Sequence, residues 1–342
     1  MVEGKGRVRL KDIADVCGCS VNTVSCALRN NPRISKETRE LIQQTASEMG
    51  YVRNNLASSL RSGKTNMVSI IVNEVKNPHF AGMINNIEKY LNAAGYELIV
   101  LLSPGQKTNM QMIRLAISMA VDGILYYPFS FDKPVVEYIE RSKIPFILLD
   151  RWIPGVNADT VRCDDKEGGY LAGSRFLSLN HKSFLYVAGP LSNSSQIDRQ
   201  EGFFNAIAEA GLPFSCVRII SWEKMQQALV SGDLVEQLSP FDYTAVFSFS
   251  DEMAYFIMKA FANNGIRIPE DISILGFDHI RQYFPYLSPL SSISVAEEYD
   301  FAKLVVQLLL RKIMYPNENH YPVVLPVNIF DEGTIGPAQR LL

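Results

Sequence analysis

The chain has 342 residues, of which 47% are hydrophobic and 20% are charged, and its formal net charge is −3 at pH 7. This composition excludes a disordered or fibrous protein, and the length favours two or three domains over a single core. No apolar run approaches the roughly 18 residues that indicate a membrane span. The N-terminal residues lack the apolar stretch of a signal peptide, so we expect a protein of the cytoplasm with no membrane partner.

The first fifty residues predict three short helices that share one small core. The first helix is indicated by apolar residues at helical spacing, namely Leu10, Ile13, Ala14 and Cys17. Ser20 and Ser35 are placed to cap the second and third helices, and Gly50 is placed to end the third. The apolar residues of these two helices that we expect in the core are Val24, Ala27, Leu28, Leu41, Ile42, Ala46 and Met49.

A row of small and polar side chains is expected to stay outside on the second helix. These residues are Val21, Asn22, Ser25, Cys26 and Arg29. Asn can read an adenine edge through two hydrogen bonds, and Val can contact a thymine methyl group. The side chains suited to phosphate contacts are Thr23, Ser25, Arg33 and Ser35. The pattern predicts a helix-turn-helix DNA-binding domain over residues 1–53, and the alternative is a helical bundle with a merely solvated face.

The uneven distribution of charge favours the same interpretation. Residues 1–64 contain eleven Lys or Arg and six Asp or Glu, whereas the other 278 residues contain 22 and 30. A basic N-terminal segment on an acidic body suits an anionic polymer held at one end only. The five cysteines are scattered and the four histidines lie far apart, so we expect reduced thiols, no metal and no cofactor.

Residues 10–25 resemble the head of LacI/GalR-family repressors. Their sequence is Leu-Lys-Asp-Ile-Ala-Asp-Val-Cys-Gly-Cys-Ser-Val-Asn-Thr-Val-Ser. The later Ile34-Ser35, Thr38-Arg39 and Met49-Gly50-Tyr51 extend this resemblance. By this resemblance, Val21, Asn22 and Cys26 occupy the positions that select the operator sequence. Many relatives carry Arg or His in place of Cys26. Because Cys cannot make a bidentate contact to guanine, we expect an operator half-site that differs from the common one.

Residues 54–65 predict a linker that contains one or two helical turns. Leu56, Ala57 and Leu60 form a small apolar stripe that Asn54 or Asn55 can cap, and so short a helix is marginal in water by itself. The resemblance implies a hinge helix that orders in the minor groove, where Leu60 wedges between base pairs and Ala57 faces the groove. Asn54 is also expected among the residues that contact DNA. Arg53 stands where relatives usually have Pro, and Ser58 stands where many have Arg. A plain flexible linker is the alternative.

From residue 66 onward, short β-rich runs alternate with amphipathic helices. We predict strands at 67–72, 97–102, 123–127, 146–150, 183–188, 217–221, 245–248, 272–277 and 291–295. We predict helices at 80–94, 107–120, 168–179, 199–210, 252–264 and 297–314. Repeated strand–helix units indicate an α/β body with doubly wound parallel sheets. So many strands favour two lobes with a cleft between them: about 66–163 plus 291–322, and about 164–290 plus 323–340.

Polar and aromatic residues follow several of these strands, at the carboxyl ends where open α/β sheets bind ligands. The candidate effector-binding residues are His79, Phe80, Phe129, Asn193, Ser195, Arg199, Trp222, Ser250 and Asp278. By the resemblance, Arg199 lies where relatives hold sugar hydroxyls or a carboxylate, and Gly276-Phe277-Asp278 is similar to a ligand-binding acidic motif. An arginine with a carboxylate and aromatic rings suits a polyol, and equally a small nucleobase or a phosphosugar. Solvated or packing roles remain the alternative for Arg199, Trp222 and Asp278.

No dinucleotide-binding glycine motif, P-loop or Gly-x-Ser-x-Gly motif occurs in the chain, so we do not expect an enzyme. The sequence predicts a homodimeric transcription regulator that binds a near-palindromic operator and responds to a sugar-like effector. By the resemblance, it is a repressor. We expect the dimer surface on residues 83–91 and 107–119. The alternative is a solute-binding receptor of a transport system, which shares the two-lobed clamp but leaves the basic head unexplained.

Overall fold

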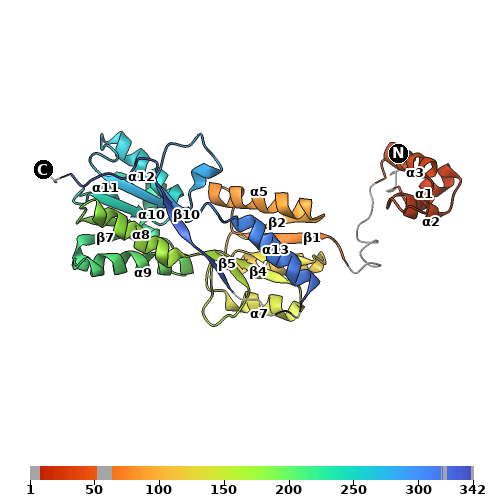
Figure 1. Cartoon of the computed structure of the whole chain (residues 1–342), viewed down its shortest axis with the longest axis horizontal. Coiled ribbons are helices and arrows are strands. Elements are labelled where there is room, and N and C mark those ends of the chain that lie inside the picture. The colour runs from red at the N-terminus through yellow and green to blue at the C-terminus, as the bar shows by residue number, and fades with distance from the viewer. Residues whose placement is uncertain (1–7, 52–63, 317, 319–321, 340–342) are drawn as a thin grey trace. The chain divides into compact units, whose positions relative to one another are not determined.

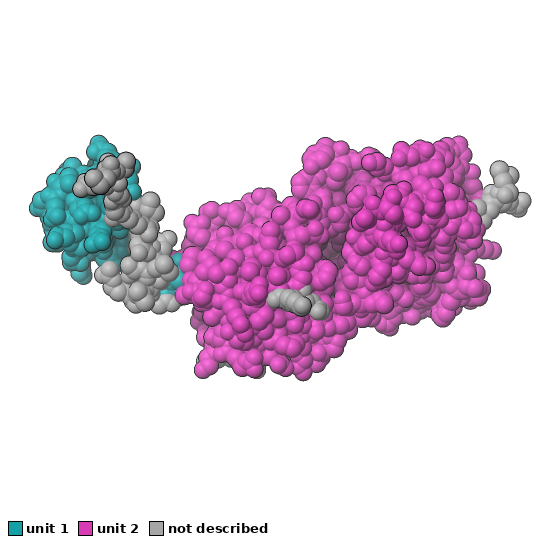
Figure 2. Space-filling model, turned by 180° about the vertical axis from the view of Figure 1, so that it is seen from behind, with its two compact units in different colours: residues 1–65 teal, residues 66–342 magenta. Residues whose placement is uncertain are grey.

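A computed structural model describes residues 8–51, 64–316, 318 and 322–339. The chain divides into two compact units, residues 1–65 and residues 66–342, called here the head and the body (Figures 1 and 2). Within the described residues, no helix has both the length and the apolar character that crossing a membrane requires.

The head consists of three helices, α1 (Leu10–Cys17), α2 (Val21–Ala27) and α3 (Lys36–Glu48). The predicted caps are confirmed, because the Ser20 hydroxyl accepts from the Thr23 amide at 3.1 Å and the Ser35 hydroxyl from the Thr38 amide at 3.3 Å. Gly50 follows α3 with φ of +67°, the left-handed conformation that ends a helix.

The core of the head is confirmed except at one position. Its fully buried side chains include Ile13, Val24, Ala27 and Ile42, and Leu28 and Met49 pack against them. The prediction for Leu41 is wrong, since its side chain is 56% exposed. One residue along a helix turns the side chain by about 100°, so the stripe that starts at Ile42 directs Leu41 away from the core.

The first lobe of the body is built on a parallel six-stranded sheet of order β11-β5-β4-β3-β1-β2. Its strands are β1 (Met67–Val72), β2 (Glu97–Leu102), β3 (Gly123–Tyr126), β4 (Phe146–Leu149), β5 (Thr160–Cys163) and β11 (Val323–Leu325). Helices α5 (Pro78–Ala93) and α13 (Phe301–Met314) share one apolar core with the sheet, whereas α6 (Gln106–Ser118) and α7 (Lys133–Ser142) share another. Figure 1 shows α5 and α7 on opposite sides of this sheet.

The second lobe repeats this plan with a sheet of order β12-β10-β9-β8-β6-β7. Its strands are β6 (Phe184–Val187), β7 (Val217–Ile220), β8 (Ala245–Ser248), β9 (Ser273–Phe277), β10 (Ser292–Val295) and β12 (Val327–Phe330). All neighbours are parallel except β10 and β12. One core contains α8 (Asp165–Ser178) and α9 (Ser194–Glu209); the other contains α10 (Trp222–Ser231), α11 (Leu234–Leu238) and α12 (Asp251–Asn263). Short 3₁₀ turns lie at η1 (Phe214–Cys216) and η2 (Ile280–Gln282).

The predicted fold class, a helix-turn-helix head and a two-lobed α/β body, is confirmed, but the lobe limits differ from the prediction. Strand β10 pairs with β9 in the second sheet, whereas residues 291–322 were expected in the first lobe. Strand β11 pairs with β5 in the first sheet, whereas residues 323–340 were expected in the second. The chain therefore crosses between the lobes three times: after β5, after β10 and after β11. Two of these crossings are joined by a hydrogen bond from the Ala296 amide to the Pro326 carbonyl at 3.0 Å.

Candidate functional site

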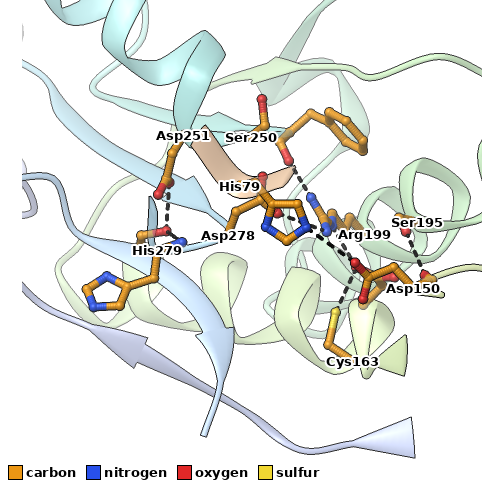
Figure 3. Close-up of polar contacts among 12 residues, drawn as sticks. His79, Asp150, Cys163, Ser195, Arg199, Ser250, Asp251, Asp278 and His279 are labelled. Carbon is orange, nitrogen blue, oxygen red and sulfur yellow. Dashed lines mark hydrogen bonds and ion pairs between the residues drawn. The ribbon is translucent and has the colours of Figure 1, made fainter. Parts of the chain in front are cut away.

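The body contains a cavity of about 410 Å³ that is lined by residues of both lobes. His79, Tyr127 and Asp150 reach it from the first lobe, and Arg199 and Asp278 reach it from the second. His79 lies in the first turn of α5, and Asp150 and Asp278 follow β4 and β9 directly. Because parallel strands end at the same edge of each sheet, facing lobes bring these distant residues together, as Figure 3 shows.

Arg199 is the best-held charged side chain of the cavity. Its Nε donates to Oδ1 of Asp165 at 2.7 Å, and one Nη donates to the Phe249 carbonyl at 2.5 Å. The other Nη lies 3.6 Å from Oδ1 of Asp278. The guanidinium also lies 3.4 Å from the centre of the Phe277 ring, a cation–π contact. Burial by itself would lower the pKa of Arg199, but Asp165 and Asp278 raise it overall, so the guanidinium stays charged.

Two of the carboxylates that line the cavity, Asp150 and Asp278, lie on strained backbone. Asp150 has φ of +60° and Asp278 has φ of +105°, values that are uncommon for residues with a side chain. The Asp278 amide donates to the Ile293 carbonyl and the Asp150 amide to the Val161 carbonyl, both at 2.8 Å, so pairing with the adjacent strand holds each conformation. Burial raises the pKa of Asp278, although His79 and Arg199 oppose this effect.

His79 lies among these charges. Its Nε2 is 3.3 Å from Oδ2 of Asp150, and its Nδ1 is buried without a hydrogen-bond partner in the described part of the chain. Burial lowers the pKa of this imidazole, but the opposing effects of Asp278 and Asp150 are larger, so the pKa is raised. The raised pKa favours the protonated ring, which reduces the repulsion between Asp150 and Asp278.

Aromatic rings form much of the remaining wall. The imidazole of His279 stacks on the Phe330 ring with centroids 4.3 Å apart and an angle of 11° between the planes. Burial lowers the pKa of His279, which favours the neutral ring. Tyr283 reaches across from the second lobe so closely that a Cβ on Gly82 of α5 would lie 2.3 Å from its ring. Flat apolar faces beside carboxylates are suited to a ligand with both polar and apolar surfaces.

Three of the nine residues that were predicted to bind the effector line the cavity, namely His79, Arg199 and Asp278. Phe80 is buried beside it and packs its ring edge-on against Tyr127, with centroids 4.8 Å apart. Phe129 contributes its carbonyl, which lies 3.4 Å from an Nη of Arg151. Neither Phe80 nor Phe129 lines the cavity.

The other four predicted residues support the cavity or lie away from it. Asn193 caps α9 by accepting from the Ser195 amide at 2.9 Å, and the Ser195 hydroxyl lies 3.4 Å from the Asp150 carbonyl. Ser250 caps α12, and Trp222 begins α10 and packs against the core of the second lobe. Asn193 and Ser195 thus place the helix that carries Arg199.

The structure brings further residues to this site. Asp150 and His279 are among the polar residues that follow the predicted strands, and both line the cavity, although neither was among the nine residues predicted to bind the effector. Tyr283 and Phe330 come from a 3₁₀ turn region and a crossover strand that the sequence pattern did not reveal. Asp165 begins α8, where an aspartate is common at a helix start, and its carboxylate faces Arg199.

Two further contacts join the lobes beside the cavity. On one side, Nδ2 of Asn77 donates to Oε2 of Glu252 at 3.1 Å. On the other, the indole of Trp152 donates to Oδ2 of Asp198 at 2.8 Å, and the Trp152 amide donates to the Ser194 hydroxyl at 3.1 Å. The two lobes therefore meet through specific hydrogen bonds. A rotation of one lobe against the other would change the lengths of these bonds and so their strength.

On the head, the predicted DNA-contacting residues share the outer face of α2 and the turn after it. Val21 is 44% exposed, Asn22, Arg29, Arg33 and Ser35 are exposed, and Thr23, Ser25 and Cys26 are half-buried. Nε of Arg29 donates to the Ser25 carbonyl at 3.0 Å. The hydroxyls of Thr23 and Ser35 already bond within their capping motifs, to Ser20 and Thr38. The predicted hinge residues Asn54, Ala57 and Leu60 lie outside the described residues.

Comparisons with known proteins cover both units. Residues 9–54 match the family model of bacterial regulatory proteins of the lacI family, and residues 65–319 match that of periplasmic binding proteins and the sugar binding domain of the LacI family. The ribose operon repressor of Haemophilus influenzae is 31% identical over 320 residues, which cover 92% of this chain and 95% of that protein.

Solved structures give the same result for the fold. A LacI family regulator from Enterococcus faecalis, with bound ribose, is 27% identical with a TM-score of 0.67 and covers 80% of this chain and 100% of its own. The Lac repressor dimer bound to operator and an anti-inducer has a TM-score of 0.78 and 21% identity, and covers 97% of this chain and 100% of its own.

Proposed function

The chain belongs to the lacI family of bacterial regulatory proteins and is a ligand-regulated DNA-binding repressor, and we propose that a sugar in the cavity between its lobes controls it. The observation that carries this proposal is the convergence of Arg199, Asp278, Asp150 and His79 on one cavity between two lobes. Carboxylates accept hydrogen bonds from sugar hydroxyls, the guanidinium donates to them, and the rings cover the apolar face of the sugar.

The relatives suggest which sugar to test first. The ribose operon repressor and the ribose-bound regulator from Enterococcus faecalis both carry ribose in their names, so we propose a pentose as the first candidate effector. Ligand cavities of proteins typically measure roughly 300–1,000 Å³, and the cavity of about 410 Å³ lies at the small end of this range. This volume favours a single sugar over a long oligosaccharide.

The head is proposed to read the operator through α2. Val21 and Asn22 project from the start of that helix, where they can contact base edges, and Cys26 lies one turn further on. Thr23, Ser25, Arg29, Arg33 and Ser35 are proposed to contact phosphates. Asn54, Ala57 and Leu60 complete the proposed DNA-contacting set through the minor groove.

A homodimer is proposed as the functional form, because paired heads can bind a near-palindromic operator. Strand β2 is the outer strand of the first sheet, and its Val100 and Leu102 are 40% and 45% exposed. Leu115 of α6 is also 41% exposed. Met83, Ile87 and Leu91 of α5 point into the core of the first lobe. The exposed apolar residues therefore favour a dimer surface on β2 and α6 over one on the 83–91 segment.

The proposal is tested by measuring the affinity of the full chain for duplex DNA from its own promoter region and for random duplexes of equal length, at one salt concentration. We expect the promoter DNA to bind about 10³-fold more tightly or better. Ribose should change that affinity by roughly 5- to 150-fold, because a coupling free energy of about 1–3 kcal/mol is typical of such control. Equal affinity for both duplexes would overturn the DNA-reading proposal. Sugar binding without any change in DNA affinity would instead indicate a solute receptor.

A further inference from the structure

We propose that Asp165, which lies behind Arg199 and outside the cavity wall, makes the cavity select uncharged sugars over phosphorylated or carboxylated ones. This inference rests on the proposed function, since it names the charge class of the effector that the same cavity accepts. Asp165 is the first residue of α8 and does not line the cavity. It is therefore a specificity-determining residue that acts through Arg199.

Asp165 compensates much of the positive charge of Arg199. The side chains of Arg199 and Asp165 are only 7% and 2% exposed, and Nε and Oδ1 are 2.7 Å apart. Two buried opposite charges in direct contact compensate each other, and neither has water to pair with instead. One Nη is also engaged by the Phe249 carbonyl. Arg199 consequently offers the cavity hydrogen-bond donors but little uncompensated positive charge.

The other charged side chains around the cavity are mostly carboxylates. Asp150 and Asp278 face the cavity, and their side chains are 15% and 13% exposed. Glu297 and Asp300 line its mouth. Among the described residues that line the cavity, Arg199 is the only Lys or Arg, and the histidines are His79 and His279. Burial lowers the pKa of His279 and so favours its neutral ring, which leaves His79 as the main second source of positive charge. Carboxylates thus outnumber cations around the ligand, even with His79 protonated.

These charges favour one class of ligand. A neutral sugar donates its hydroxyl hydrogens to Asp150 and Asp278 and accepts from the remaining N–H groups of Arg199, so every charged group keeps a partner. A phosphate or carboxylate brings negative charge beside two carboxylates, and Asp165 already compensates the arginine. Like charges placed together oppose binding, so a phosphosugar should bind about tenfold more weakly than the neutral sugar, or worse.

The experiment uses the full chain and compares matched neutral and anionic probes by isothermal titration. Ribose is compared with ribose 5-phosphate, and glucose with glucuronate, in which a carboxylate replaces the hydroxymethyl group with little change in size. We expect the wild-type protein to bind the neutral member of at least one pair about tenfold more tightly or better. In Asp165→Asn the side chain keeps its shape but loses its charge, so the neutral-to-anionic ratio should fall by about tenfold or more.

The control variant is Glu201→Gln on α9. Glu201 forms an exposed ion pair with Lys166, and its side chain is 52% exposed. This change also removes one negative charge from the body but leaves the Arg199 contacts intact, so the ratio should stay at its wild-type value. If Glu201→Gln changed the ratio as much as Asp165→Asn did, net charge would determine the preference and the role of Asp165 would be refuted.

The remaining outcomes separate this inference from the proposed function. Wild-type protein that prefers the neutral member in neither pair, yet binds at least one probe, overturns the inference while the effector cavity stands. This measurement needs no variant, so it decides the question even if Asp165→Asn does not fold. An unchanged ratio in a folded Asp165→Asn also overturns the inference. If no probe of either charge binds the wild-type protein, the sugar assignment of the proposed function fails, and this inference fails with it.

Discussion

The head and the body place their functional residues in opposite environments. The head keeps a small apolar core and exposes Val21 and Asn22 on the outside of α2. The body buries Arg199 at the cavity between its lobes and Asp165 behind it. An exposed residue can be replaced with little effect on folding, whereas a buried charge depends on its partner. We therefore expect that substitutions in the head can change DNA binding without changing the stability of the fold. Substitutions of the buried charges in the body should change effector binding and stability together.

Replacing Arg199 should give the largest effect. Arg199→Ala leaves the Asp165 carboxylate buried and unpaired, and Asp278 without its cationic neighbour. Removing one partner of a buried ion pair typically costs about 3–5 kcal/mol, so the free energy of unfolding of the body should fall by that amount. Urea unfolding followed by tryptophan fluorescence measures it, because Trp152 and Trp222 both lie in the body.

The control for Arg199 is Arg175→Ala. Arg175 forms an ion pair with Asp331, and both side chains are 40% exposed. Exposed pairs contribute roughly 0–1 kcal/mol, so this variant should unfold almost as the wild type does. If both arginine variants lost the same small amount, the contrast between buried and exposed charge would not hold in this protein.

The second effect concerns the helix that carries Arg199. A Cβ on Gly202 of α9 would lie 1.9 Å from the Lys166 carbonyl of α8, so the two helices pack backbone to backbone at this point. Gly202→Ala should force the helices apart and cost about 1–3 kcal/mol of unfolding free energy. It should also weaken ribose binding, because Arg199 lies one turn away. Asn205→Ala, exposed on the same helix, should leave both quantities nearly unchanged.

The difference between the head and the body also explains how well the sequence predicted each of them. The fold of the head depends on contacts between neighbouring helices, so caps and periodicity located all three helices, and only Leu41 was misplaced. In the body, the nine predicted strands were found at or near their limits, although six of them have only four residues. Strands β5, β11 and β12 were missed, because β11 has only three residues and β5 and β12 include polar residues such as Arg162 and Asn328.

The sequence predicted those site residues whose position depends on a single nearby strand or helix. His79, Arg199 and Asp278 follow or begin recognisable elements, and all three line the cavity. Phe330 reaches the cavity through β12, which pairs antiparallel with β10 after the third crossing between the lobes. Tyr283 depends on how closely Gly82 allows α5 to approach it. Neither arrangement has a local signal in the sequence, since each depends on packing between distant segments.

A third prediction examines the head. Asn22→Ala should reduce discrimination between the operator and a site with one changed base pair by about 1–3 kcal/mol. Arg33→Ala should weaken binding to all sequences alike. It should also lower the slope of log affinity against log salt concentration by about one. Both residues are exposed, so the unfolding free energy should change by about 0.5 kcal/mol or less. Fluorescence anisotropy with labelled duplexes at several salt concentrations measures these effects. Loss of folding in either variant would contradict the separation of DNA reading from stability.

The smallest effect is a pH dependence that belongs to the body, because all four histidines follow residue 65. Nδ1 of His181 lies 2.8 Å from the Thr244 hydroxyl, and Nε2 lies 2.9 Å from the Gly336 carbonyl. Burial lowers the pKa of His181 below its ordinary value of 6.5. Protonation therefore favours the unfolded state, so this contribution to stability is complete above pH 6.5 and declines as the pH falls from there toward the folded-state pKa.

His79 should behave in the opposite way, which makes the pair a sharp test. Its raised pKa means that its contribution is complete below pH 6.5 and is lost as the pH rises through the folded-state value. Urea midpoints between about pH 5 and pH 8 should thus decline less at acid pH in His181→Gln than in the wild type, and should decline more in His79→Gln. If both variants changed the wild-type slope in the same direction, the neighbouring carboxylates would not outweigh burial at His79, and the protonated histidine beside Asp150 and Asp278 would have to be abandoned.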